Sequence, residues 1–288
     1  MVPLSELARE SLIESVKISL IMFAMMILVE IFVIKLKDKV IKKFANKKAV
    51  SKYAVASFFG IIPGCIGTFA MDSLYMSGLI GFGTLTTTLI STSGDEAFLM
   101  LSLAQQGKIS WTIIGLLTLT LFILGILGGF LADIFVKKTK LKLCEKCSIK
   151  KHKGKESDFK HFVKEHIFEH IIKKHLWKIF LWIFAALLII SFIEKNTTFN
   201  FAMTNSFYAL LIASSIALLP ISGPNVFLIV MFSKGMIPFS ILLANSIIQD
   251  GHGLLPIIGF SLDDAFKLKL FNFIFGFLIG LALFCLGI

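Results

Sequence analysis

Two short clusters of ionisable residues interrupt apolar stretches of the sequence. Asp95 and Glu96 follow one stretch, and Asp250 and His252 follow another. Ionisable groups within apolar membrane segments are costly, so a functional role is their default interpretation. Carboxylates, an imidazole and side-chain amides together suit a divalent cation of hard to intermediate character, such as Mn²⁺, Mg²⁺ or Zn²⁺. The two clusters are therefore candidates for one cation site.

The candidate ligands are polar residues at or near these clusters: Asp95, Glu96 and Ser93 in the first half, and Asp250, His252, Gln249, Asn225 and Asn245 in the second. Cys65 would add a softer sulfur donor and widen the range toward heavy metals or metalloids. The alternative for the clusters is a structural polar network that locks two turns. For Cys65 the alternative is a small buried hydrophobe. Asp72 is expected near the external end of its span.

The two stretches are copies of one unit. A constant offset of 157 residues, without a gap, matches Pro63 with Pro220, Gly78 with Gly235, Phe82 with Phe239, Leu85 with Leu242 and Gly94 with Gly251, and it pairs Asp95 with His252 and Ser93 with Asp250. Each copy has helix-breaking residues near its start: Pro63 and Gly64, and then Pro220, Gly223 and Pro224. Paired, interrupted apolar segments in two halves indicate the binding region of a secondary transporter.

The composition is typical of a multi-pass membrane protein. Of the 288 residues, 56% are hydrophobic and 16% are charged. The net charge of +11 comes mainly from lysines in two loops, 35–52 and 137–178, which is the positive-inside pattern and not that of a nucleic-acid-binding protein. We therefore expect both loops in the cytosol and the chain in the plasma (inner) membrane, with lipid and no nucleic acid as its surroundings.

Charge also constrains the topology. If both basic loops are cytosolic, the segments between them cross the membrane an even number of times. Spans at about 54–76 and 109–135 supply two crossings, so 79–106 and its copy 236–260 are expected to be re-entrant hairpins or pairs of short spans. The two halves then have opposite orientations.

The predicted fold class is an all-α membrane protein. It has about ten transmembrane or re-entrant helical segments in two inverted repeats with Pro/Gly-broken helices. Residues 1–136 form the first repeat, 137–175 a basic cytosolic linker, and 176–288 the second repeat.

The linker is a second candidate metal site. Cys144 and Cys147 have a spacing suited to zinc, and His166 and His170 lie one turn apart on a helix. A solvated basic loop is an equal alternative. The histidines also fit the H-x-x-E-H pattern of inverted zinc peptidases, which makes a metal-dependent membrane hydrolase a remote alternative. We expect no enzyme and no bound cofactor, since the metal would be the substrate.

Proton antiport is expected from the carboxylates. Several adjacent carboxylates cannot all stay ionised in a dry site, so loss of the metal should raise their proton affinity. The nearest rival is transport of an organic or oxyanionic solute, because the N-terminal ends of broken helices suit anions. Against this rival, the deep positions of the sequence hold carboxylates and neither Lys nor Arg.

Four motifs resemble the family of ten-span heavy-metal exporters, which are also labelled manganese transporters and are distantly allied with arsenical permeases. They are Ile62-Pro63-Gly64-Cys65, Ser93-Gly94-Asp95-Glu96-Ala97-Phe98, Pro220-Ile221-Ser222-Gly223-Pro224-Asn225 and Gln249-Asp250-Gly251-His252-Gly253. The resemblance covers essentially the whole chain and implies a transporter with ten membrane segments. The resulting expectation is a secondary active exporter of a divalent or heavy metal ion, manganese-like, with proton coupling. A homodimer stays an open alternative.

Overall fold

The computed structural model describes residues 8–20, 49–76, 78–139, 180–181, 183–185, 187–189, 207–219 and 223–287. These parts of the chain form helices and short connections, and none of them is a strand. The predicted all-α class is therefore confirmed for the described residues.

The helices are short except for two. In chain order they are α2 (Ala49–Ile61), α3 (Ile66–Met76), α4 (Phe82–Ser91), α5 (Glu96–Gln105), α6 (Trp111–Thr139), α9 (Phe207–Ile216), α10 (Gly223–Ser233), α11 (Phe239–Ile248), the 3-10 helix η2 (Gly251–Leu254), α12 (Leu255–Phe260) and α13 (Leu262–Cys285). Three segments of the described chain are long and apolar enough to cross a membrane: Trp111–Thr139, Phe239–Phe260 and Leu262–Cys285. The total of ten segments stays a prediction, because long stretches of the chain lie outside the described residues.

Helix bounds recur at the offset of the sequence repeat. α4 begins at Phe82 and ends at Ser91, while α11 begins at Phe239 and ends at Ile248, each 157 residues later. The bounds of α3 and α10 are separated by the same 157 residues. Equivalent sequences in the two halves therefore form helices with the same limits.

The turns after α3 and α10 are also alike. Gly78 and Gly235 have φ angles of 70° and 71°, in the left-handed region that favours glycine. The Gly78 N–H donates to the Tyr75 carbonyl at 2.8 Å, and the Gly235 N–H donates to the Phe232 carbonyl at 2.9 Å. These bonds use carbonyls that the ends of the two helices would otherwise leave without a partner.

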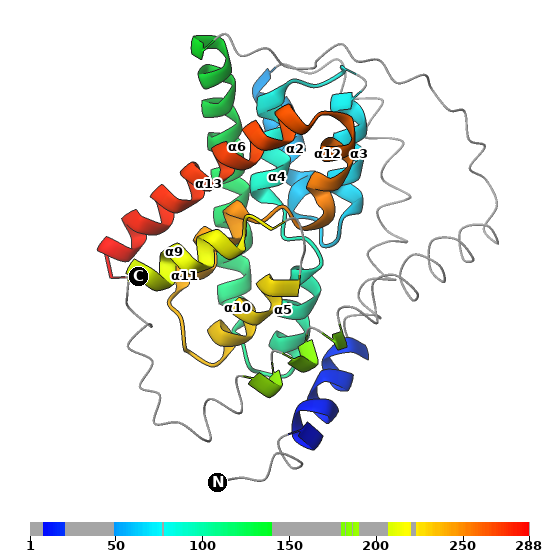
Figure 1. The fold of residues 1–288 in the computed structure, drawn as a ribbon, viewed down its shortest axis with the longest axis vertical. Coiled ribbons are helices and arrows are strands. Elements are labelled where there is room, and N and C mark those ends of the chain that lie inside the picture. Colours follow the sequence, from blue (N-terminus) through cyan, green and yellow to red (C-terminus); the bar gives the residue numbers. More distant parts are fainter. Residues whose placement is uncertain are drawn as a thin grey trace, which may run out of the picture.

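The packing of the helices repeats as well. α4 packs on α2 and α6, and α11 packs on α9 and α13. Among the contacts that join the halves, α3 lies against α12, and α10 lies against α5 (Figure 1). At the 157-residue offset, α10 corresponds to α3 and α12 corresponds to part of α5. The α10–α5 contact is therefore the counterpart of the α3–α12 contact, as a two-fold relation between the halves would produce.

The chain reverses at a different break from the one expected. α2 packs against α3, so Ile62–Cys65 is the turn of a helical hairpin. In contrast, α4 and α5 do not pack along one another, and Figure 1 shows α4 in the upper and α5 in the lower part of the molecule. In the second half, Phe239–Phe260 is one candidate span and not a hairpin. The hairpins or paired spans expected at 79–106 and 236–260 are therefore replaced by interrupted single segments.

Backbone geometry explains this difference. Proline has no N–H to continue a helix, and Gly64, directly after Pro63, has a φ of +92°. This combination turns the chain back. Thr92, after α4, is extended, and Gly94 has a φ of +52°, which interrupts the helix without returning the chain along it. The polar clusters thus mark interruptions of a segment and not reversals.

Candidate metal site

Three potential metal ligands converge from three separate connections. Cys65 lies in the α2–α3 turn, Asp95 directly precedes α5, and His252 lies in η2. One ligand atom from each lies within 4.8 Å of the others. The Cys65 Sγ is 3.8 Å from Asp95 Oδ1, and the His252 Nδ1 is 3.8 Å from Asp95 Oδ2. Sulfur, oxygen and nitrogen donors thus surround one point.

Glycines bring these connections together. The Gly64 N–H donates to the Gly94 carbonyl at 2.9 Å, which joins the turn of Cys65 to the interruption of Asp95. A Cβ on Gly253 would lie 2.5 Å from the Thr68 Cγ2. The connection that carries His252 can therefore approach α3 only because residue 253 has no side chain.

The donor set determines which ions fit. Zinc is held by thiolate at about 2.3 Å and by imidazole or carboxylate at about 2.0–2.2 Å. Tetrahedral ligand atoms around such an ion lie roughly 3.3–3.8 Å apart. The distances of 3.8 Å from Asp95 to the Cys65 Sγ and to the His252 Nδ1 therefore need little change. Asp95 is buried, whereas Cys65 and His252 are partly exposed, which gives a solute access to the site.

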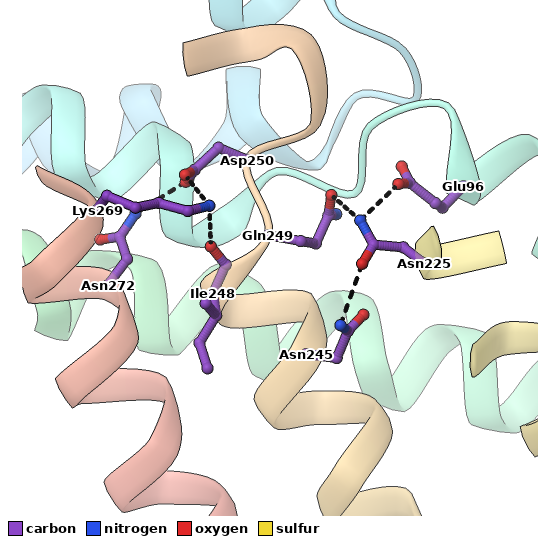
Figure 2. A network of polar contacts seen from close by, with 8 residues as sticks. All are labelled: Glu96, Asn225, Asn245, Ile248, Gln249, Asp250, Lys269 and Asn272. Atoms are coloured by element: carbon purple, nitrogen blue, oxygen red, sulfur yellow. Dashed lines mark hydrogen bonds and ion pairs between the residues drawn. The ribbon is translucent and has the colours of Figure 1, made fainter. Parts of the chain in front are cut away.

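A second cluster of candidate residues forms an amide network. Figure 2 shows Asn225 at its centre. The Asn225 Nδ2 donates to Glu96 Oε1 at 3.2 Å and to Gln249 Oε1 at 3.4 Å, and its Oδ1 accepts from Asn245 Nδ2 at 3.1 Å. All four side chains are buried. This is the polar network that stood as the alternative to ligation for these residues.

A third cluster surrounds Asp250. The Lys269 Nζ donates to Asp250 Oδ2 at 2.6 Å and to the Ile248 carbonyl at 2.9 Å, and the Asn272 Nδ2 donates to Asp250 Oδ1 at 2.9 Å (Figure 2). Both oxygens of Asp250 are therefore occupied. Asp250 is not among the three clustered ligands and is held by an internal counter-ion.

The expectation that the deep positions hold neither Lys nor Arg is wrong. Lys269 is only 8% exposed. It lies almost two turns inside α13, and Asn272 follows one turn later on the same helix. That spacing of two polar residues within an apolar helix is the signal that could have found them.

Gln249 and Asp250 belong to different clusters although they are adjacent. Gln249 is extended, with φ −72° and ψ 133°, so the two side chains point to opposite sides of the connection after α11 (Figure 2). The single broken segment therefore serves both the amide network and the ion pair.

Of the remaining predicted residues, some lie within the described parts of the chain and some lie outside them. Ser93 is buried, and its carbonyl accepts the Ala97 N–H at 3.2 Å at the start of α5. Gly223 and Pro224 begin α10. Pro220 and the linker residues Cys144, Cys147, His166 and His170 lie outside the described residues.

Comparison with known proteins gives a family but no characterised relative. A family model described as "Putative, 10TM heavy-metal exporter" matches residues 9–205 and 148–287. Neither the curated proteins nor the solved structures contain a match. Since the two matched stretches together take in most of the chain, this integral membrane protein belongs to the ten-span heavy-metal exporter family.

Proposed function

We propose that the chain is a secondary transporter that exports a divalent heavy metal ion, and that Cys65, Asp95 and His252 bind it. The observation that carries this proposal is the convergence of three donor atoms within 4.8 Å, drawn from both halves of the chain. A solute held between two halves can be released to either side when they move relative to one another.

The donors favour an ion softer than manganese. Carboxylate and water ligands suit Mn²⁺, whereas a cysteine sulfur beside an imidazole suits zinc and similar ions. We therefore expect Zn²⁺ and Cd²⁺ to be transported in preference to Mn²⁺. The order of these ions in a flux assay distinguishes this preference from the manganese-like alternative.

Proton coupling follows from the same ligands. A metal binds the thiolate and the neutral imidazole, so loading the site displaces protons. An inward proton gradient would then favour unloading on the external side by returning those protons. The direction of this coupling agrees with export.

An inverted repeat accounts for the geometry. With α2–α3 as a re-entrant hairpin, α4–α5 as a crossing and α6 as a second crossing, the loops 35–52 and 137–178 still lie on one side, as their lysines suggest. The second half repeats these elements with the opposite orientation. Cys65, Asp95 and His252 then lie where the helix interruptions of the two halves meet.

The experiment uses the purified chain in proteoliposomes. In a background with Cys144 and Cys147 changed to serine, Cys65→Ser should lower Cd²⁺ affinity at least about 100-fold, in line with the largest effects of altering a metal's surroundings. Cys285→Ser is the matched control, because Cys285 is the other free cysteine in the described part of the chain and is exposed. Equal Cd²⁺ binding and flux in both variants would contradict the proposed site.

Lys269 supports a second candidate, transport of an oxyanion. It is a buried cation beside the segment that ends in Asp250. Its charge is already balanced by Asp250, which makes this candidate the weaker one. Arsenate or phosphate flux that is lost in the double variant Lys269→Met with Asp250→Asn, which keeps most of the stability, would favour it if the unaltered chain moves neither Zn²⁺ nor Cd²⁺.

A further inference from the structure

Asp72 differs from the other buried carboxylates of the described chain. It lies in α3, its exposed fraction is 0%, and neither carboxylate oxygen has a hydrogen-bond partner within the described residues. Asp264, in contrast, accepts from the Tyr75 hydroxyl at 2.8 Å, and Asp250 has Lys269 and Asn272. Only Asp72 among these three is buried without a donor.

A carboxylate in this position would be an uncompensated charge. Burial without a hydrogen bond or counter-ion penalises the ionised form strongly. The elements packed against α3 offer little compensation: α4 and α12 carry no ionisable side chain, α2 carries Lys52 and Tyr53, and η2 carries His252. The neutral acid therefore suits this environment.

Asp72 lies on the helix that follows the metal site. Cys65 directly precedes α3, and Asp72 is seven residues further, about two helical turns or roughly 10 Å along the axis. α3 also packs against η2, which carries His252. A metal ion at Cys65, Asp95 and His252 would thus place positive charge at one end of the helix that holds Asp72.

We propose that Asp72 is a proton-carrying residue that couples metal export to proton entry. The inference rests on the proposed function, and it adds to the protons of the ligands one that is carried by a residue outside the metal site. Asp72 takes a proton from external water while the metal site is empty and releases it to cytosolic water when the metal binds. The carboxylate left behind offsets one positive charge of the incoming ion, and Asp72 moves one proton inward for each metal ion that leaves, in addition to the protons displaced from the ligands.

Asp72→Asn tests this assignment, because it keeps the shape of the side chain and removes its ionisation. Zn²⁺ flux is measured in proteoliposomes with and without a pH gradient, together with Zn²⁺ binding by calorimetry. We expect flux at equal pH to persist and the acceleration by the gradient to fall several-fold, to the part that the ligand protons supply. The Zn²⁺ affinity should fall about tenfold, because a proton released on metal binding and the metal affinity are coupled reciprocally. Asp72→Glu should retain the acceleration because it retains an acid.

Asp264→Asn is the matched control, since Asp264 is a buried carboxyl that has a hydrogen-bond donor. It should keep the response to the gradient. An Asp72→Asn variant that responds to the gradient like the unaltered chain, or that loses Zn²⁺ binding as completely as a ligand variant, would overturn the assignment while leaving the proposed export intact. If the unaltered chain moves no metal at any pH, the proposed function fails as well, so the two failures are distinguishable.

Discussion

The two halves of the molecule have the same backbone arrangement but different polar side chains. The Thr88 hydroxyl of the first half donates to the Ala56 carbonyl at 3.2 Å, and the Asn245 amide of the second half donates to the Ala213 carbonyl, also at 3.2 Å. Asn245 and Ala213 lie 157 residues after Thr88 and Ala56, so the two bonds join equivalent positions. The same contact is therefore made by a hydroxyl in one half and by an amide in the other.

The same relation holds one turn further on. Thr68 and Thr92 are 3.2 Å apart at their hydroxyls, and the equivalent pair Asn225 and Gln249 are joined at 3.4 Å. Hydroxyls satisfy bonds within their own half. The longer amides also reach across the molecule, where Asn225 bonds Glu96 of the first half. Equivalent positions of the two halves thus carry different polar side chains, and in the second half these side chains also join the halves.

The ion pair of the second half should show the largest difference from the first. Lys269→Met leaves Asp250 as a buried, uncompensated charge and should lower the free energy of unfolding by about 3–5 kcal/mol. Ser93, at the equivalent position of the first half, has no charge to balance, so Ser93→Ala should cost much less. Thermal unfolding of the protein in detergent measures both.

A double variant sharpens this test. Lys269→Met combined with Asp250→Asn removes both charges and should recover most of the loss, because replacing a complete buried pair is often nearly neutral. A double variant as unstable as Lys269→Met alone would show that the ion pair is not the cause.

The proposed metal ligands should show the next largest effect. Asp95 and His252 occupy equivalent positions in the two halves, and Asp95→Asn should weaken Zn²⁺ binding by about 100-fold. Exchanging the two residues, as Asp95→His with His252→Asp, keeps the donor set and should keep the affinity within about tenfold. Calorimetric titration of the purified protein gives both values. Equal loss in the single and exchanged variants would mean that the donors do not act as one set.

Removing the equivalent hydrogen bonds of Thr88 and Asn245 should lower the free energy of unfolding by unequal amounts. Thr88→Val loses one buried bond, worth about 0.6 kcal/mol within a membrane protein. Asn245→Leu loses two bonds and leaves the Asn225 Oδ1 without its donor, so about 1–2 kcal/mol is expected. Unfolding free energies of the two variants, measured in the same detergent, test this order. A larger loss for Thr88→Val would contradict the account of the amide network.

The two glycine turns should show the smallest difference. Gly78→Ala and Gly235→Ala each place a Cβ in the left-handed region, at a cost of about 1–2 kcal/mol. Since the angles and hydrogen bonds agree, the two costs should be equal within about 0.5 kcal/mol. Unequal melting temperatures of the two variants would show that the turns are alike in shape but not in energy.

Much of the fold was predictable because it depends on local and repeated features. The 157-residue offset located α3, α4, α10 and α11 in pairs, since equal sequence patterns form equal helices. The hairpin was assigned to the wrong segment because 54–76 was counted as a full crossing, which left no net crossing for 79–106. Reversal depends instead on the backbone at Pro63 and Gly64, where a missing N–H and a φ of +92° act together.

The sequence by itself determined the helical class, the positions of the helix breaks and the residue types near the candidate site, because hydrophobicity, proline and glycine act over a few neighbouring residues. Only the tertiary structure decided which of those residues act together. It grouped Cys65 with Asp95 and His252, and it gave Asp250 to Lys269. Side-chain direction at a helix break depends on single backbone angles, and contacts between distant segments depend on close packing. Neither follows from composition or spacing alone.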